Sequence, residues 1–173
     1  MSKQLPIVAH MVCYNEEAFI EYAIESVINY VDCVDVIEGS WASTHITGGT
    51  LRSTDGTIDI LQRLKNKYGD KISLRFINEK TQLEQRNRVF DDINGPTVLW
   101  LWDADEIIDP IEAEKVVEVA NNMQFECYKM TANTFVNDAF TYCPIDFPRL
   151  FLVDTKYRFI EPNKIMKPTG SPP

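Results

Sequence analysis

The sequence is poor in the residues on which several classes of site depend. Only two histidines, His10 and His45, and four cysteines occur in 173 residues, and no two cysteines form a Cys-x-x-Cys pair. This spacing excludes a zinc knuckle and gives no support to a disulfide framework. It also assembles no Ser-His-Asp or Cys-His set for nucleophilic catalysis. We therefore expect free thiols, mostly buried, as in a cytoplasmic protein.

Long apolar runs are also missing. The opening segment MSKQLPIVAHMVCYNEE has a short apolar stretch that soon meets Asn15 and two glutamates, which does not fit a secretory signal. No run approaches the ~18 apolar residues of a membrane-spanning helix. We expect no transmembrane segment and a cytoplasmic location.

Positive charge is scarce, because 17 Lys and Arg face 26 Asp and Glu and the net charge is −9. This balance excludes a general electrostatic grip on nucleic acid or on an anionic membrane. If a ligand carries phosphates, a metal ion or local donors must offset the protein's charge. With 45% apolar and 25% charged residues, the composition is that of one globular domain and excludes intrinsic disorder.

Strand and helix patterns alternate along the first two thirds of the chain. Strands are predicted over residues 6–12, 35–38, 71–77 and 97–102, and helices over 16–31, 82–90 and 110–122. A further helix, which either Thr54 or Asp55 can cap, has its apolar side at Ile58, Leu61, Leu64 and Tyr68. Asn15 and Asp109 are the predicted N-caps of the first and last of these helices. Residues 125–135, 148–153 and 157–160 are predicted as strands without intervening helices. The pattern indicates an α/β fold with a mostly parallel central sheet, helices on both faces and antiparallel strands toward the C-terminus.

Two of the predicted strands end on acids, Glu38 and Asp103. In open α/β sheets ligands bind outside the carboxyl ends of the strands. Asp103 and Asp105, one residue apart in a turn, can converge on Mg²⁺ or Mn²⁺, which prefer oxygen ligands. Arg86, on the predicted helix over 82–90, can reach a phosphate at the same edge. The structural alternatives are a solvated acidic turn and a solvent-exposed helix arginine.

Glycine motifs that cradle phosphates are absent. The sequence contains neither G-x-G-x-x-G nor a P-loop, which argues against a dinucleotide dehydrogenase and a P-loop NTPase. Four other motifs follow one another instead: YNEE at residues 14–17, STDGT at 53–57, QRNR at 85–88 and DADE at 103–106. Taken with PRLF and YRF further on, they resemble the family-2 glycosyltransferases, which have the GT-A fold. The resemblance covers roughly residues 6–160.

The resemblance implies transfer of a sugar, a hexose or a related one, from a UDP- or GDP-sugar to an acceptor hydroxyl that it does not identify, with inversion. Val12 and Tyr14 would line the nucleotide pocket, and Tyr14 would stack on the base. Glu38 stands where the family usually has an aspartate that reads the base edge. Arg86 matches the family's nucleotide-contacting arginine.

A divalent cation, Mn²⁺ or Mg²⁺, is also implied by the resemblance. Asp103 would face the ribose and the metal, and Asp105 would hold the metal through the diphosphate. Such an ion offsets the negative charge that develops on the departing nucleoside diphosphate.

The sequence departs from the family pattern in two places. Residues 41–54 separate Ser40 from Asp55, which usually follows almost at once, so they form an insertion at the edge of the donor site. The family's catalytic base usually lies in a later acidic motif or a His-Glu pair, yet no histidine follows Asp105. Glu161 is the acid nearest the expected position of that base.

These departures leave alternatives open. We expect one domain over residues 1–165 and a flexible tail over 166–173, which would also suit the start of a linker to a missing C-terminal region. The chain would then be a fragment of a larger transferase, or a nucleotide-sugar-binding module without catalysis. A sugar-phosphate nucleotidyltransferase is a further alternative, although the acidic VCYNEE stretch stands where a basic, glycine-rich signature is expected.

Overall fold

A six-stranded sheet with strand order β3-β2-β1-β4-β6-β5 forms the centre of the computed structural model, which describes residues 4–41, 50–135, 142–161 and 164–166. The strands β1, β2, β3 and β4 run parallel, whereas β6 is antiparallel to β4 and β5 is antiparallel to β6. This confirms the predicted α/β class with antiparallel strands toward the C-terminus. The sheet strands are β1 (Ile7–Cys13), β2 (Cys33–Glu38), β3 (Ile72–Phe76), β4 (Thr97–Leu101), β5 (Cys127–Phe135) and β6 (Tyr142–Val153).

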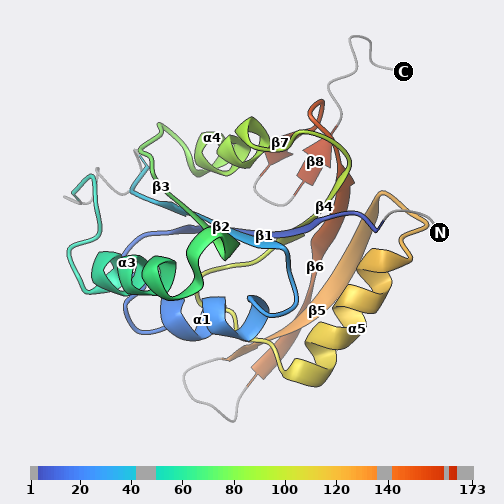
Figure 1. Ribbon diagram of the computed structural model, residues 1–173, viewed down its shortest axis with the longest axis horizontal. Helices are drawn as coiled ribbons and strands as arrows, with labels where there is room; N and C mark the ends of the chain where they lie inside the picture. The colour runs from blue at the N-terminus through green and yellow to red at the C-terminus, as the bar shows by residue number, and fades with distance from the viewer. Residues whose placement is uncertain (1–3, 42–49, 136–141, 162–163, 167–173) are drawn as a thin grey trace.

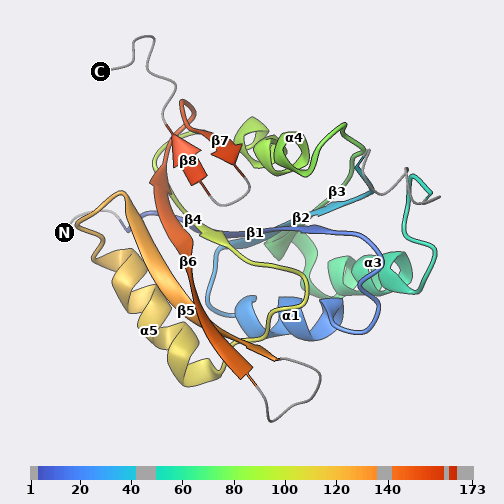
Figure 2. The same cartoon turned by 180° about the vertical axis from the view of Figure 1, so that it is seen from behind.

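Both faces of the sheet are covered (Figures 1 and 2). Helices α1 and α3 lie on one face, and α5 packs beside β5 and β6. The other face carries α4 and a separate two-stranded hairpin, β7 with β8. The bounds are α1 (Ile20–Val27), α3 (Thr57–Tyr68), α4 (Gln82–Asn87), α5 (Pro110–Asn121), β7 (Arg158–Glu161) and β8 (Lys164–Met166).

The sheet separates two apolar cores, and β4 contributes to both because its side chains alternate. Val98 and Trp100 pack on the side of α1, α3 and α5, while Leu99 and Leu101 pack on the side of α4 and β7. All five residues of β4 are buried. This burial confirms the strand predicted over 97–102, and it agrees with the unbroken apolar run VLWLW, which is typical of a strand covered on both faces.

The first helix differs most from its prediction. It begins at Ile20, not at residue 16, and Asn15 is not its N-cap. Asn15 has a positive φ of 57°, and its side-chain oxygen accepts a hydrogen bond from the backbone N–H of Thr54. The Asn15 side chain, which the local pattern predicts as a helix cap, therefore bonds to the distant residue Thr54 instead.

Other predicted boundaries were closer. Asp109 caps α5 as predicted, accepting a hydrogen bond from the N–H of Ile111 at 2.8 Å. The helix predicted over 82–90 is α4 followed by a 3₁₀ turn, Arg88–Asp91. Strand β6 begins at Tyr142, earlier than predicted, and its Pro148 is tolerated beside a β-bulge, where a missing N–H disturbs the ladder least. Met166, expected as the start of the tail, is the last residue of β8, and residues 167–173 lie outside the described chain.

Candidate functional site

The carboxyl ends of β1, β2 and β4 meet where the strand order reverses. The chain passes from β1 outward to β2 and β3 and returns on the other side of β1 as β4. This is the topological switch point at which open α/β sheets bind ligands. The last residues of these three strands and the turns after them carry all the site residues predicted from the sequence except Arg86 and Glu161.

Asp103, in the turn after β4, lies between two arginines. Its Oδ1 accepts a hydrogen bond from Arg86 Nη2 at 2.7 Å, and its Oδ2 accepts one from Arg149 Nη1 at 3.0 Å. Burial alone would raise the pKa of the Asp103 carboxyl, but the two guanidinium groups outweigh burial and hold that pKa below its usual value. The structure thus brings together Arg86 and Asp103, which the sequence had placed 17 residues apart.

Arg86 projects from α4 and is nearly buried, with 4% of its surface exposed. Only Nη2 contacts Asp103, whereas Nε and Nη1 are buried without a hydrogen-bond partner among the described residues. Buried guanidinium donors in folded proteins are normally paired, so two unpaired donors on one side chain mark a position where an anionic or carbonyl oxygen would be bound favourably.

Glu106 closes the same turn. Its Oε2 accepts a hydrogen bond from the backbone N–H of Asp103 at 3.0 Å, and its Oε1 forms an ion pair with Arg149 Nη2. Burial raises the pKa of Glu106 to about 7, against the opposing effect of the Arg149 charge. The carboxylates of Asp103 and Glu106 are therefore both occupied within the protein.

Asp105 differs from these two acids because its side chain is exposed. The pKa of nearby Glu16 is raised, first by burial and then by the charges of Asp105, Asp55 and Asp103, so this rim of the site is acidic. Among the described residues, no group of three or more His, Cys, Asp or Glu side chains is arranged to hold a metal ion.

Asp105 nonetheless fits a divalent cation that arrives with its ligand. Mg²⁺ and Mn²⁺ sites commonly use one or two carboxylates, with phosphate oxygens and water completing the coordination. Asp103 fits such an ion less well, because both of its oxygens already pair with arginines. The available metal ligands suit a site whose coordination a phosphate completes, and they do not suit a site in which the protein supplies every ligand.

Val12 and Tyr14 stand at the end of β1, next to this region. Val12 is buried, and it lies on the same face of β1 as His10 and Val8, the face that carries α4. Tyr14 is half-buried just beyond the strand. The roles of both residues in a nucleotide pocket stay a prediction.

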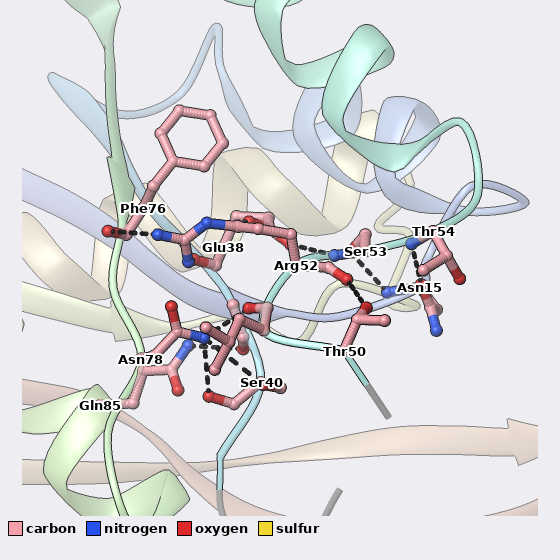
Figure 3. Close-up of polar contacts among 12 residues, drawn as sticks. Asn15, Glu38, Ser40, Thr50, Arg52, Ser53, Thr54, Phe76, Asn78 and Gln85 are labelled. Carbon is pink, nitrogen blue, oxygen red and sulfur yellow. Dashed lines mark hydrogen bonds and ion pairs between the residues drawn. The ribbon is translucent and has the colours of Figure 1, made fainter. Parts of the chain in front are cut away.

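Glu38, at the end of β2, points elsewhere (Figure 3). In the register of the sheet it pairs with Cys13, a member of the core on the α1 and α3 side, opposite the face of α4. The side chain is fully buried. Its Oε1 accepts a hydrogen bond from the N–H of Ser53 at 2.8 Å, and Oε2 lies 3.8 Å from Arg52 Nε. The structure does not bring the Glu38 carboxylate together with Arg86 and Asp103.

The Arg52 side chain lies next to the Glu38 carboxylate (Figure 3). Its guanidinium donates to the carbonyl of Phe76 at 3.0 Å and sits 5.5 Å from the centre of the Phe76 ring. Ser40, which directly precedes the predicted insertion, is joined to the described part of that insertion, since the Ser40 N–H donates to the Leu51 carbonyl at 3.3 Å. Residues 42–49 of the insertion lie outside the described chain.

The YNEE and STDGT motifs hold each other by backbone hydrogen bonds. The N–H of Asn15 donates to Ser53 Oγ, that of Glu16 to Thr57 Oγ1, and that of Glu17 to Asp55 Oδ2, at 2.8–3.0 Å. In return, the N–H groups of Thr54 and Gly56 donate to the side chains of Asn15 and Glu17. Most polar groups of the two motifs are thus used to join the turn after β1 to the start of α3.

Glu161 is exposed at the last position of β7. That strand is tied to α4 by Asn87, whose side chain exchanges two hydrogen bonds with the backbone of Phe159. The role of Glu161 as the catalytic base stays a prediction.

Sequence reasoning missed Arg149, which joins Asp103 to Glu106 from β6. Two signals pointed to it: Arg149 lies in the PRLF segment of the family resemblance, and it is a charged residue inside the otherwise apolar run PRLFLV. A buried strand accepts such a residue only when its charge is paired, and that pairing is now visible in the turn after β4.

Comparison with known proteins relates the whole arrangement to one family. The family model described as Glycosyl transferase family 2 matches residues 9–146. No curated protein sequence matches the chain. Among the described residues, no helix combines the length and apolar character needed to cross a membrane.

Two solved structures were found to be similar to the chain. A crystal structure of S. aureus TarS, residues 1–349, has 15% identity and a TM-score of 0.53, covering 71% of this chain and 34% of that one. The mannosyltransferase PcManGT from Pyrobaculum calidifontis, in complex with GDP-Man and Mn²⁺, has 20% identity and a TM-score of 0.48, covering 69% and 33%. This chain therefore spans about a third of the length of each structure.

Proposed function

The chain belongs to glycosyl transferase family 2, and from that premise we propose that it binds a nucleotide-sugar donor at the switch point and transfers the sugar to an acceptor hydroxyl. The observation that carries the proposal is the pair formed by Arg86 and Asp103. Arg86 keeps two buried donors open beside this pair, where the diphosphate and ribose of a donor would lie. An arginine with free donors is well suited to anionic oxygens.

The nucleoside would occupy the space between the end of β1 and α4. Val12 supplies an apolar wall and Tyr14 a ring on which a base can stack. We expect a UDP- or GDP-sugar as the donor. Glu38 is assigned a different task in this proposal, because its buried carboxylate holds Ser53 and Arg52 and so supports the turn that borders the pocket.

Asp105 would hold Mn²⁺ or Mg²⁺ together with the donor diphosphate. When bound, this ion would act as a Lewis acid and offset the charge of the departing nucleoside diphosphate. Asp103 would remain with its two arginines and accept a hydrogen bond from the ribose at its partly exposed edge, since its side chain is 33% exposed. An inverting transfer also needs a carboxylate that takes the proton of the acceptor hydroxyl, and Glu161 is the proposed candidate.

Thermal unfolding with UDP, GDP and their sugars, each with Mn²⁺ and with EDTA, tests the donor site. A ligand at a hundredfold excess over its dissociation constant stabilises the native state by about 2.7 kcal/mol. We expect a metal-dependent shift with one nucleotide. The variant Asp105→Asn should lose the shift, and the matched control Asp59→Asn, on the exposed face of α3, should keep it.

Equal stabilisation in EDTA would contradict the proposed role of the metal, and no shift with any nucleotide would contradict the donor site. Transfer itself is tested by hydrolysis of the preferred donor with and without acceptor sugars. Binding without turnover would favour the alternative of a donor-binding module.

A further inference from the structure

We infer that Arg149 is a positioning residue for the donor site: it fixes the turn over residues 103–106 by bridging Asp103 and Glu106 from the antiparallel strand β6. The inference rests on the proposed function for its effect on donor binding. Its structural basis is independent of any ligand, because all three side chains are described and their contacts are internal to the protein.

The strand register explains why an arginine on β6 reaches this turn. The ladder between β4 and β6 ends with Trp100 opposite Leu150, so Arg149 stands one residue beyond it, beside the point where β4 becomes the turn. Arg149 also stands at the register shift between β5 and β6, where Tyr128 pairs with Leu150 and Lys129 with Pro148. Its contact with Asp103 Oδ2 places the guanidinium beside the carboxylate that Arg86 approaches from α4.

The contacts of Arg149 leave little freedom to the turn. One terminal nitrogen holds Asp103 Oδ2 and the other holds Glu106 Oε1, while Glu106 Oε2 accepts from the N–H of Asp103. The guanidinium also lies 4.9 Å from the centre of the Phe147 ring. A planar group with donors in fixed directions can join two carboxylates in this way, whereas a lysine ammonium acts as a point charge.

The contacts of Arg149 also give Asp103 and Asp105 different surroundings. It completes the pairing of Asp103, which Arg86 alone would leave with one free oxygen. Asp105, between the two anchored residues 103 and 106, is then the carboxylate directed to solvent. Holding Asp103 and Glu106, which stand on either side of Asp105 in the turn, sets where the Asp105 carboxylate stands relative to Arg86.

The test compares Arg149→Gln and Arg149→Lys with the wild type and with a control, Arg158→Gln. Arg158 is an exposed arginine on β7, and its hydrogen bonds go to backbone carbonyls of its own neighbourhood. Two quantities are measured. Calorimetric titration with UDP and with GDP in the presence of Mn²⁺ gives the dissociation constant, and amide hydrogen exchange without ligand gives the protection of Asp103 and Glu106.

We expect Arg149→Gln to weaken nucleotide binding at least about tenfold, the scale of one charge-assisted hydrogen bond. Exchange at the amides of Asp103 and Glu106 should quicken by about tenfold, since local opening governs it. Arg149→Lys should recover part of both effects, and Arg158→Gln should show neither. If Arg149→Gln fails to fold, Arg149→Lys decides with the same two measurements.

Unchanged binding by a folded Arg149→Gln would overturn the inference, whether or not exchange in the turn had changed. Failure of the proposed function gives a different result, because the wild type itself would then bind neither UDP nor GDP. In that case exchange alone decides: a loosened turn in Arg149→Gln supports the positioning role, and an unchanged turn overturns it.

Discussion

Asn15 accepts a hydrogen bond on its Oδ1 from the backbone N–H of Thr54 at 2.8 Å, across 39 residues of sequence. The bond is part of a set in which the YNEE turn and the STDGT turn satisfy each other's backbone groups. These two motifs contributed much of the resemblance to glycosyltransferases. In the structure most of their polar groups join the turn after β1 to the start of α3, and Tyr14 is the residue of the two motifs that we propose to contact a ligand.

Substitutions at Asn15 should separate its side-chain bond from its backbone conformation. Asn15→Ala loses the bond to Thr54 and keeps a φ of 57°, which alanine tolerates less well than asparagine, so we expect a loss of about 2–3 kcal/mol of unfolding free energy. Asn15→Gly loses the bond but accepts the φ, and should cost about 1 kcal/mol. Urea unfolding measures the loss of stability for both variants, and Asn66→Ala, on the exposed face of α3, is the control. Equal losses for the two variants would contradict the conformational part.

Gly39 should tolerate no side chain. Its φ is 146°, and an added Cβ would lie 2.1 Å from the carbonyl oxygen of Ile77, which is backbone and cannot move aside freely. We expect Gly39→Ala to destabilise the fold by about 3 kcal/mol or more. Gly95→Ala is the matched control, because nothing lies within 4 Å of its added Cβ. Similar melting temperatures for the two variants would show that the turn after β2 is more adaptable than described.

His10 should make the stability of the fold depend on pH. It is fully buried on β1, and its Nδ1 lies 2.8 Å from Asp35 Oδ2. Because Asp35 is also paired with Arg75, its carboxylate accepts, and Nδ1 must carry the proton. Burial lowers the pKa of His10 below 6.5, against the opposing effect of Asp35 and with smaller contributions from Arg86 and Arg75.

The sign follows from proton binding. Between pH 6.5 and the lower pKa of the folded state, the unfolded chain binds more protons at His10, so this contribution to stability is present above pH 6.5 and lost as the pH falls. Urea unfolding from pH 8 to pH 5 should show a decline of up to about 1.4 kcal/mol per pH unit from this residue. His10→Gln keeps a donor for Asp35 and cannot titrate, so its decline should be shallower; an identical slope would contradict the prediction.

Asp103 and Asp105 should differ in what their substitution changes. Asp103→Asn leaves the buried cations Arg86 and Arg149 without their shared anion, and we expect a loss of about 1–3 kcal/mol in unfolding free energy. Asp105→Asn should change that free energy by no more than about 0.5 kcal/mol, since its side chain is exposed. Titration of Asp105→Asn with UDP or GDP in the presence of Mn²⁺ should show no binding. A destabilised Asp105→Asn, or a fully stable Asp103→Asn, would contradict this division.

Much of the fold could be predicted because its signals are local. The unbroken apolar run became β4, the capping residue Asp109 began α5, and the alternation of strands and helices gave the parallel part of the sheet. Apolar periodicity and caps act within a few residues, so one sequence contains them completely. The predictions that were wrong concern groups with distant partners, such as the capping role of Asn15.

The sequence by itself determined the α/β class, the order of the elements and the placing of acids at strand ends. Only the tertiary structure decided what each of these acids does. It turned Glu38 away from Arg86 and buried it under Arg52, paired Asp103 with Arg149 from a strand 46 residues later, and exposed Asp105. The reason is that a carboxylate's task depends on the charges and the burial around it, and these come from segments that only packing brings together.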